Sequence, residues 1–455
     1  MKALLVFPRF RYPSGDPPLG VAYLASVMRR EGADVSVFDC TWLKRPLAAF
    51  VRHLHETRYD LIGVSALTSM LREVAQIARV AKQVNPDSLV LVGGPHATVE
   101  PESTLSLPGV DAVAIGEAEH AAGELVRRGL QPEGVPGVWY RAEGEVVRGP
   151  EPQLVDDLDA LPFPAWDLLD MRRYVSLWYH LDAVRYGLHG TSIIASRGCP
   201  FRCAYCQPTL QRLFGSRVRR RSPQNLLAEM IELRDRFRID GLMWLDDTFL
   251  TSAAWMRDFC SHALEAKTGL IWGANVRADL VDEDTLALMK EAGLRIIHLG
   301  IESASQRVLD EVYQKGITLE QVREAVAMAK RLGLFVRGYF MLGAPTETLD
   351  EAEATIRLAN TLDLDDVTFS ITTPLPHTHL YDVSRDSIAA DFSDFDYYKR
   401  PVYASDRVLP GPVLNRLRRR GYLRFYLGRR RLWRTVRSLL GISGLRKALL
   451  KVQRF

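Results

Sequence analysis

The chain has 455 residues, of which 47% are hydrophobic and 25% are charged, a composition typical of a globular protein with two to four domains. No apolar run approaches the ~18 residues of a membrane span, and five cysteines do not suggest a disulfide-stapled secreted protein, so we expect a reduced cytoplasmic setting. The net charge of +4 is uneven, because residues 407–455 carry fifteen Lys or Arg and no acid, whereas the preceding 406 residues carry a net charge of −11.

The first part of the chain alternates strand-like apolar runs with helical patterns. The strand-like runs are residues 3–7, 35–39, 61–65, 89–92 and 112–115. Five strand–helix units in succession predict an α/β domain on a doubly wound parallel sheet, which we place at residues 1–140. Ligands of such sheets bind beyond the carboxyl ends of the strands, so the residues that follow each run are candidates for binding.

Small and hydroxylated residues follow the third and fourth of these runs, and they permit close approach of the backbone to a large flat or phosphorylated ligand. The segments PPLGVAYLASVMRR, VSALTS, VGGPHAT and IGEAE, in this order, resemble the N-terminal cobalamin-binding domain of one branch of the radical S-adenosylmethionine (SAM) enzymes. The resemblance implies cobalamin as a cofactor. The residues expected to bind it are Ser65, Thr68, Ser69, Gly93, Gly94 and His96. An ordinary flavodoxin-like regulatory or nucleotide-binding domain is the alternative.

One motif of many cobalamin proteins is absent. None of the ten histidines stands in a DxHxxG motif, which places a histidine under cobalt, and after Asp39 the chain reads Cys40-Thr41-Trp42. This branch commonly lacks that histidine, so the resemblance holds, but the lower face of cobalt has no assigned ligand. His96 is either such a ligand or, as a lone histidine without partners, a loop residue that packs its ring.

Three cysteines, Cys199, Cys203 and Cys206, stand at CxxxCxxC spacing directly after the β-branched run at residues 191–196. Three thiolates this close in sequence can hold three irons of one [4Fe–4S] cluster and leave the fourth iron open. The alternatives are three buried thiols and a structural zinc site, which normally needs a second pair of ligands. With the aromatic Tyr205 before the last cysteine, the motif resembles that of the radical SAM superfamily. The resemblance implies that the open iron binds SAM and that a 5′-deoxyadenosyl radical is formed.

Strands and helices alternate again after residues 141–190, whose prolines predict a packed connector. The strand candidates are residues 191–196, 241–245, 271–274, 296–301, 336–342 and 367–372. Six units are what the partial (β/α) barrel of radical SAM proteins requires, with residues 199–206, which we call the cysteine loop, after the first strand. We place this domain at residues 191–390. Sites of such barrels lie at the carboxyl ends of the strands.

Acidic residues follow the second and fourth of these strands. Asp246 and Asp247, in WLDDTF, resemble the family's variant of the motif that receives the SAM amino group, which a carboxylate suits by charge pairing. Glu302 and Ser303, in LGIES, resemble the family segment that contacts the SAM ribose or carboxylate. Arg277 follows the third strand and faces either a carboxylate or substrate, or forms a surface salt bridge.

Two basic segments allow more than one interpretation. Residues 217–221 are either a solvated face or a contact for an anion or a redox partner.

The C-terminal region, residues 391–455, has a helical pattern in which Phe425, Leu432 and Trp433 stand among arginines. This pattern suits an amphipathic helix on anionic lipid, with nucleic acid as the rival partner. Packing of the tail on the acidic body of the same chain is the structural alternative.

Together the resemblances predict a cobalamin-dependent radical SAM enzyme, and the best-populated chemistry of the branch is methyl transfer to an unactivated carbon. The alternatives are a cyclase, oxidase or ring-rearranging enzyme with the same cofactors, and a cobalamin or flavodoxin-like sensor with a vestigial cluster. The implied partners are a small-molecule, lipid or natural-product substrate and a low-potential electron donor such as flavodoxin or ferredoxin, and nucleic acid is not expected. We expect a cytoplasmic location with peripheral contact to the inner membrane face. No general base is predicted, because radical abstraction does not need one.

Overall fold

The computed structural model describes residues 1–9, 15–396, 401–403, 407–428 and 431–432. The chain divides into two compact units. Unit 1 comprises Met1–Met171, Pro208–Arg219 and Asp391–Ser393, and unit 2 comprises Arg172–Gln207, Arg220–Ala390 and Asp394–Phe455. Within the described ranges, no helix combines the length and the apolar character needed to cross a membrane.

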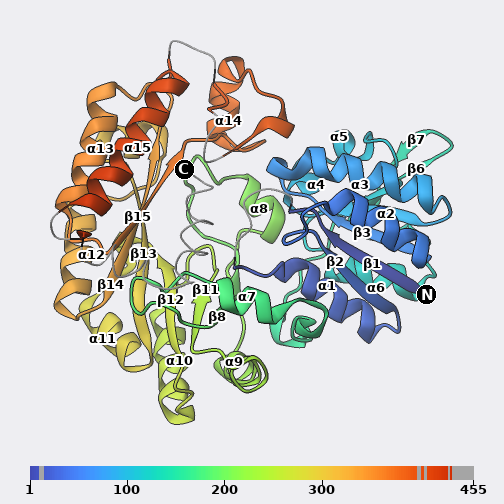
Figure 1. Cartoon of the computed structure of the whole chain (residues 1–455), viewed down its shortest axis with the longest axis horizontal. Helices are drawn as coiled ribbons and strands as arrows, with labels where there is room; N and C mark the ends of the chain where they lie inside the picture. Colours follow the sequence, from blue (N-terminus) through green and yellow to red (C-terminus); the bar gives the residue numbers. More distant parts are fainter. Residues whose placement is uncertain (10–14, 397–400, 404–406, 429–430, 433–455) are drawn as a thin grey trace. The chain divides into compact units, whose positions relative to one another are not determined.

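Unit 1 is built on a seven-stranded sheet in the order β2-β1-β3-β4-β5-β6-β7 (Figure 1). Its strands are β1 (Lys2–Phe7), β2 (Asp34–Asp39), β3 (Leu61–Ser65), β4 (Leu89–Gly93), β5 (Ala112–Ala114), β6 (Val138–Ala142) and β7 (Glu145–Val147). Its helices are α1 (Leu19–Arg30), α2 (Pro46–Glu56), α3 (Leu71–Val84), α4 (Pro95–Val99), α5 (Pro101–Leu105), α6 (Glu119–Arg127) and α8 (Thr209–Phe214). β1 to β5 pair in parallel, as predicted, and the antiparallel β6 and β7 extend the sheet beyond that prediction.

The core of unit 1 lies between this sheet and its helices. Residues 3–7 of β1 are all buried, although successive side chains point to opposite faces, because a parallel sheet of this kind is covered on both faces. On α3 the buried residues Val74, Ile77, Ala78 and Ala81 recur every three or four positions and form one apolar face. The apolar runs of the sequence therefore form the sheet, and the helical patterns between them form the helices that cover it.

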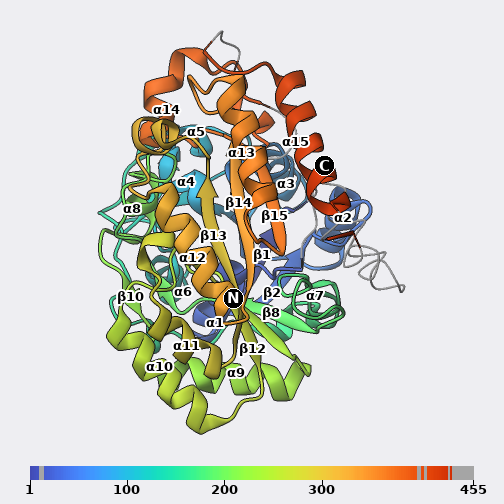
Figure 2. The same cartoon turned by 90° about the vertical axis from the view of Figure 1, so that its left-hand side faces the viewer.

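Unit 2 is built on six parallel strands in the order β15-β14-β13-β12-β11-β8. The strands are β8 (Gly190–Ile193), β11 (Gly241–Trp244), β12 (Ile271–Val276), β13 (Leu294–Glu302), β14 (Phe335–Leu342) and β15 (Asp366–Ile371). The short strand β9 (Ser196–Arg197) also belongs to unit 2, whereas β10 (Arg219–Arg220) has its first residue in unit 1 and its second in unit 2. The helices are α7 (Met171–Leu177), whose first residue belongs to unit 1, α9 (Pro223–Phe237), α10 (Ala253–Ala266), α11 (Glu283–Glu291), α12 (Leu319–Arg331), α13 (Leu349–Thr361), α14 (His379–Ser384) and α15 (Gly411–Leu427). Figure 2 shows α9 to α13 along the outer face of this sheet, and the predicted six-unit partial barrel is confirmed.

The two units differ in how their helices begin. In unit 2, α9 to α14 each start at a Ser, Thr or Asp whose side chain accepts a hydrogen bond from a first-turn N–H; these residues are Ser222, Ser252, Asp282, Thr318, Thr348 and Thr378. In unit 1, α1 to α6 all begin without a side-chain cap. The first-turn N–H groups of these six helices therefore lack this source of pairing.

The C-terminal helix α15 packs on unit 2. Phe425 is completely buried, and the Tyr422 hydroxyl lies 2.9 Å from the Phe369 amide nitrogen, which donates to it. The predicted insertion of Phe425 into lipid is therefore wrong, because this ring belongs to the core of the unit. Leu432 is 43% exposed, and Trp433 lies outside the described residues.

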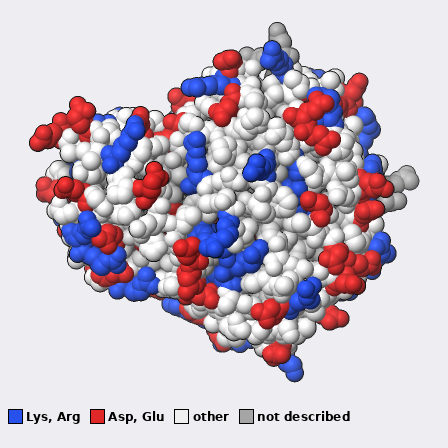
Figure 3. Space-filling view, turned by 180° about the vertical axis from the view of Figure 1, so that it is seen from behind, with Lys and Arg blue, Asp and Glu red and all other residues white. Residues whose placement is uncertain are grey.

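The basic run at residues 217–221 is not a uniformly solvated face. Arg219 donates two hydrogen bonds of 2.7 Å to the carboxylate of Glu117, and both side chains are almost completely buried. Arg221 pairs with Glu229, which is also buried. These two arginines are therefore neither a solvated face nor a contact for an anion or a redox partner, because each is bound in a buried ion pair. On the face drawn in Figure 3, acidic and basic side chains are interspersed.

Candidate functional site

The cysteine loop of unit 2 follows the first strands of the barrel. The amide N–H groups of Cys206 and Gln207 both donate to the carbonyl of Cys203, each at 3.0 Å, so the last two cysteines lie on one turn. The Ala204 N–H donates to the carbonyl of Tyr313 at 2.8 Å and fixes this turn to the loop after β13. None of the three cysteines forms a disulfide. The Cys199 sulfur lies 3.5 Å from the hydroxyl of Thr248, which follows β11.

The surroundings of the three sulfurs favour cations. Burial raises the pKa of the Cys199 thiol and of the Cys206 thiol, and the neighbouring sulfurs and the Asp247 carboxylate raise both further. Irons bound by the sulfurs would offset this cost, because they supply positive charge where three thiolates would repel one another. Within the part of the chain that the structure describes, no group of three His, Cys, Asp or Glu is placed to hold a single metal ion. A cubane cluster does not require such a group, since each thiolate binds a different iron.

The two predicted acids after β11 have different environments. Asp246 is 1% exposed, and its carboxylate accepts hydrogen bonds from the Ser196 hydroxyl and from the Ala195 N–H at 3.1 Å. Asp247 is exposed to solvent. Burial raises the pKa of Asp246 to about 6. Asp246 thus ties the segment that leads into the cysteine loop to the end of β11, and Asp247 is the acid left open to a ligand.

Glu302, at the end of β13, forms a buried network with two residues from other segments. The Lys315 ammonium donates to Glu302 Oε1 at 2.7 Å and to the Tyr205 hydroxyl at 3.1 Å, and that hydroxyl lies 3.4 Å from the same carboxylate oxygen. The Lys315 and Glu302 side chains are only 6% and 10% exposed. The network joins the cysteine loop to β13. Lys315 was not predicted from the sequence, because it stands thirteen residues after Glu302 and belongs to none of the motifs.

Ser303 does not join this network. It is completely buried, its hydroxyl accepts the N–H of Ser305 at 3.1 Å, and it lies 3.4 Å from the hydroxyl of Thr355 on α13. Ser303 therefore shapes the loop that follows Glu302.

Arg277, directly after β12, reaches the cysteine loop. Its Nη1 donates to the sulfur of Cys203 at 3.4 Å, and its guanidinium also pairs with Asp279. Arg277 is 6% exposed, so the predicted surface salt bridge is instead a buried pair next to a cysteine sulfur.

In unit 1 the loops after β3 and β4 meet through their backbones. The Ala66 N–H donates to the Gly93 carbonyl at 2.7 Å, and the His96 N–H donates to the Ala66 carbonyl at 3.0 Å. Gly94 has a φ of +105°, and a Cβ at this position would lie 3.0 Å from the Ala66 carbonyl oxygen. Only glycine fits this approach without strain. Ser65, Ser69, Gly93 and Gly94 are half-buried, so the edge keeps small, partly accessible residues for a ligand.

Thr68 and His96, one from each of these two loops, are both buried and lie in contact. The Thr68 hydroxyl is 3.1 Å from His96 Nδ1, and the imidazole packs edge to face against Phe392 with the ring centroids 5.6 Å apart. His96 is completely buried, and burial lowers the pKa of its imidazole to about 4. These contacts join the two loops through a neutral histidine.

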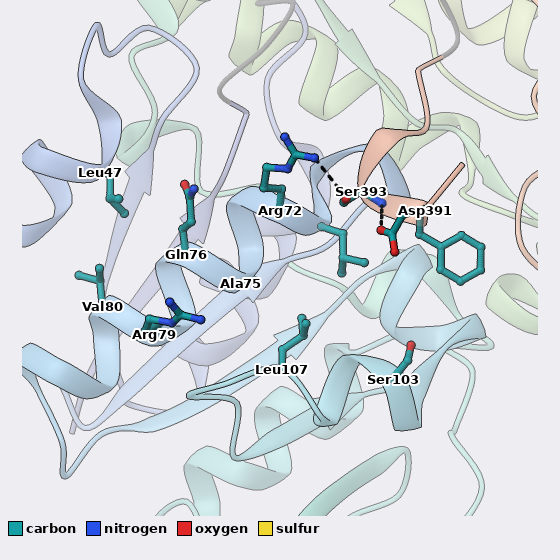
Figure 4. Close-up of a pocket in the computed structure, with 12 residues that line it drawn as sticks. Leu47, Arg72, Ala75, Gln76, Arg79, Val80, Ser103, Leu107, Asp391 and Ser393 are labelled. Carbon is teal, nitrogen blue, oxygen red and sulfur yellow. Dashed lines mark hydrogen bonds between the residues drawn. The ribbon is translucent and has the colours of Figure 1, made fainter. Parts of the chain in front are cut away.

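A cavity of about 610 Å³ lies elsewhere in unit 1 (Figure 4). It is bordered by α2, α3, the region of α5 and residues 391–393, and the side chain of Arg72 reaches Ser393 at 3.5 Å. Its lining residues are Leu47, Leu71, Arg72, Ala75, Gln76, Arg79, Val80, Ser103, Leu107, Asp391, Phe392 and Ser393. None of the residues predicted to bind cobalamin is among them.

Both predicted domains match known families. Residues 14–126 match the B12-binding domain, and residues 193–359 match the radical SAM superfamily. These matches confirm the resemblances from which cobalamin, a [4Fe–4S] cluster and SAM were predicted as cofactors. The donor set of the cysteine loop and the small-residue edge of unit 1 are chemically suited to these groups.

Individual proteins resemble the chain over most of its length. An uncharacterised methyltransferase of Pyrococcus horikoshii is 34% identical, and the alignment covers 94% of this chain and 93% of the relative. The anaerobic magnesium-protoporphyrin IX monomethyl ester cyclase of Rubrivivax gelatinosus is 27% identical, with 94% and 78% covered. The structure of the radical SAM methyltransferase TsrM from Kitasatospora setae, with cobalamin and a [4Fe–4S] cluster bound, matches with a TM-score of 0.70 at 20% identity and covers 85% of this chain and 75% of that one.

Proposed function

This chain belongs to the cobalamin-binding branch of the radical SAM enzymes, and on that premise we propose that it transfers a methyl group to an unactivated carbon. When bound, the cluster with SAM supplies a 5′-deoxyadenosyl radical and cobalamin supplies a transferable methyl group. The observation that carries the proposal is the grouping around the cysteine loop, where three free cysteines, the open acid Asp247 and the Glu302–Lys315 network come together. The similarity to the Pyrococcus horikoshii methyltransferase supports methyl transfer.

The site residues of unit 2 divide into cluster ligands, SAM-binding residues and residues that position the loops. Cys199, Cys203 and Cys206 hold the cluster. Asp247 receives the ammonium of SAM, because it is the acid after β11 whose carboxylate stays accessible. Glu302 binds SAM from the carboxyl end of β13, with its carboxylate oriented by Lys315 and Tyr205, whereas Asp246 and Ser303 position their loops.

In unit 1 we propose that Ser65, Ser69, Gly93 and Gly94 contact cobalamin at the carboxyl edge of the sheet, and that Thr68 and His96 hold the two loops together. Half-burial of the first four and complete burial of His96 support this division. The proposed domains are residues 1–140 for cobalamin, 141–190 for the connector, 191–390 for the barrel and 391–455 for the C-terminal region.

As a radical SAM enzyme, the protein needs a reductant and a small-molecule substrate. We propose a low-potential flavodoxin or ferredoxin as the electron donor and a lipid or another natural product as the substrate. We also propose a cytoplasmic enzyme that contacts anionic lipid through the outer face of α15. The exposed residues Arg416, Arg419, Leu423 and Leu427 recur at helical spacing on that face, and Leu423 and Leu427 are 50% and 58% exposed.

The experiment that tests the reaction uses anaerobically reconstituted protein with cobalamin, SAM, a reductant and deuterated candidate substrates. We expect deuterium in 5′-deoxyadenosine and a product heavier by one methyl in place of one hydrogen. The variant with Cys199, Cys203 and Cys206 all changed to Ala should lose the cluster and both signals. Zinc bound in place of iron by the wild-type protein would contradict the proposal.

A cyclase, oxidase or rearranging enzyme is the second candidate, which the resemblance to the Rubrivivax gelatinosus cyclase favours. It predicts deuterium in 5′-deoxyadenosine as well, but a product that has lost hydrogen or kept the substrate's mass. The product mass therefore separates the two reactions.

A further inference from the structure

Arg277 is held against the cysteine loop by contacts on several sides. Its Nε and Nη2 donate to the two oxygens of Asp279 at 3.0 and 3.1 Å, and Nη2 also donates to the Lys315 carbonyl at 2.8 Å. The guanidinium carbon lies 3.6 Å from the centroid of the Phe201 ring, and Phe201 is part of the cysteine loop. The plane of the guanidinium and its rotation within that plane are therefore both fixed.

The remaining terminal nitrogen, Nη1, points at a cysteine sulfur. It lies 3.4 Å from the sulfur of Cys203, which is 7% exposed. Asp279 binds the opposite edge of the guanidinium, through Nε and Nη2, so the ion pair presents its positive end to the sulfur. Water is largely excluded from both side chains, and electrostatic effects are correspondingly stronger than at a surface.

We propose that Arg277 raises the reduction potential of the cluster by its oriented N–H···S bond to Cys203. This inference rests on the proposed function, in which Cys203 is a cluster ligand. Reduction adds one electron to the cluster, and a donor aimed at a ligand sulfur stabilises the more negative state. Arg277 is thus a positioning residue of the electron-transfer step, and it sets how strong a reductant the enzyme needs.

The test is a reductive titration of the full-length, reconstituted protein, with the reduced cluster followed by electron paramagnetic resonance and the iron content measured in parallel. Arg277→Gln should retain four irons and should be reduced at a more negative potential, by at least tenfold in the one-electron equilibrium constant, or about 59 mV. Asp279→Asn should shift the potential in the positive direction, because it removes a negative charge and leaves the guanidinium on Phe201 and the Lys315 carbonyl. Arg331→Gln, which breaks an exposed pair with Glu283 in the same unit, is the matched control and should not move the potential.

Opposite shifts in Arg277→Gln and Asp279→Asn support the proposal. An unchanged potential in an iron-loaded Arg277→Gln protein overturns it, and so do shifts of the same sign in both variants, which indicate loosened packing. If Arg277→Gln does not take up iron, Arg277→Lys is tested in its place. Its potential should shift in the negative direction by less, since Lys keeps the charge but loses the planar guanidinium that orients the N–H···S bond. An unchanged potential in iron-loaded Arg277→Lys also overturns the proposal. A wild-type protein that does not bind four irons contradicts the proposed function itself. The iron content therefore tests the proposed function, and the potentials test the role of Arg277.

Discussion

Gly300 provides the space in which Glu302 and Lys315 meet. A Cβ at this position would lie 2.5 Å from Glu302 Oε1 and 2.7 Å from Lys315 Nζ, and Glu302 itself has a φ of +65°, which side-chain-bearing residues adopt rarely. Strain of this kind persists where the surrounding structure fixes it, and it is concentrated at functional sites. The end of β13 is therefore shaped around this ion pair.

The first prediction concerns this space. Gly300→Ala should displace the two flexible side-chain ends and weaken SAM binding about tenfold, which corresponds to the loss of roughly one charge-assisted hydrogen bond. Anaerobic calorimetry of the reconstituted protein measures the affinity, and the iron content should stay at the wild-type level. Gly20→Ala is the control, because a Cβ there meets no atom within 4 Å. Wild-type SAM affinity in Gly300→Ala would contradict the proposed role of the Glu302–Lys315 pair.

The second prediction concerns Glu347, which is 4% exposed and accepts the N–H groups of Gly343 at 2.6 Å and Ala344 at 3.3 Å. Burial raises the pKa of its carboxyl group to about 7 from an ordinary value near 4.5. Between these two pH values the folded state binds more protons than the unfolded state, so this residue makes the free energy of unfolding fall as pH rises, by about 3 kcal/mol in total.

Glu347→Gln removes that titration. The free energy of unfolding of the variant relative to wild type should increase by about 3 kcal/mol between pH 4.5 and pH 8. Urea denaturation of the apoprotein at the two pH values measures it, with the exposed Glu265→Gln as the control. A difference between variant and wild type that does not change with pH would show that the pKa of Glu347 is not raised in the folded protein.

At the scale of residues, the sequence predicts chemical types better than roles. The spacing of Cys199, Cys203 and Cys206 is local and visible in one stretch. The separate environments of Asp246 and Asp247 are not, because they depend on Ser196 and Ala195, which stand fifty residues away. Lys315 was missed for a related reason: a turn brings it back to Glu302, and no periodic pattern marks such a turn.

At the scale of elements, the apolar runs predicted all six barrel strands and the five parallel strands of unit 1. The hairpin of β6 and β7 was missed, although a two-residue turn, Glu143-Gly144, with φ values of +52° and +88°, separates the two strands. That signal is the usual one for a hairpin. The buried roles of Arg219 and Arg221 were missed because charge runs are usually solvated, and no local pattern indicates that Glu117 and Glu229 pair with them in the interior.

The third prediction concerns α15. Leu423→Ser combined with Leu427→Ser should reduce flotation of the protein with anionic vesicles severalfold without unfolding it, because both leucines are exposed while Phe425 in the same helix stays in the core. Leu264→Ser, on α10 and 39% exposed, is the control. Binding of wild type should weaken with salt, since the arginine contribution is screened. Equal flotation of the double variant and wild type would mean that this face does not contact lipid.

At the scale of the whole molecule, the motifs of two families, one after the other along the chain, predicted the two folds. They did not predict which distant segments complete each unit. Residues 208–219 directly follow the cysteine loop in sequence and yet belong to unit 1, where Arg219 pairs with Glu117. Residues 391–393 also belong to unit 1, where Phe392 packs on His96. Such returns of the chain depend on long-range pairing that no local pattern in one sequence records.

The uncapped helices of unit 1 have a consequence for the protein in the cell. A missing cap costs about 0.5–2 kcal/mol, and a ligand that binds only the folded unit restores stability in proportion to its concentration relative to its Kd. We expect limited proteolysis of the apoprotein to cleave within residues 1–171 first and added cobalamin to protect them, whereas equal cleavage with and without cobalamin would contradict this. On this account we expect the amount of intact protein in the cell to rise and fall with the supply of cobalamin.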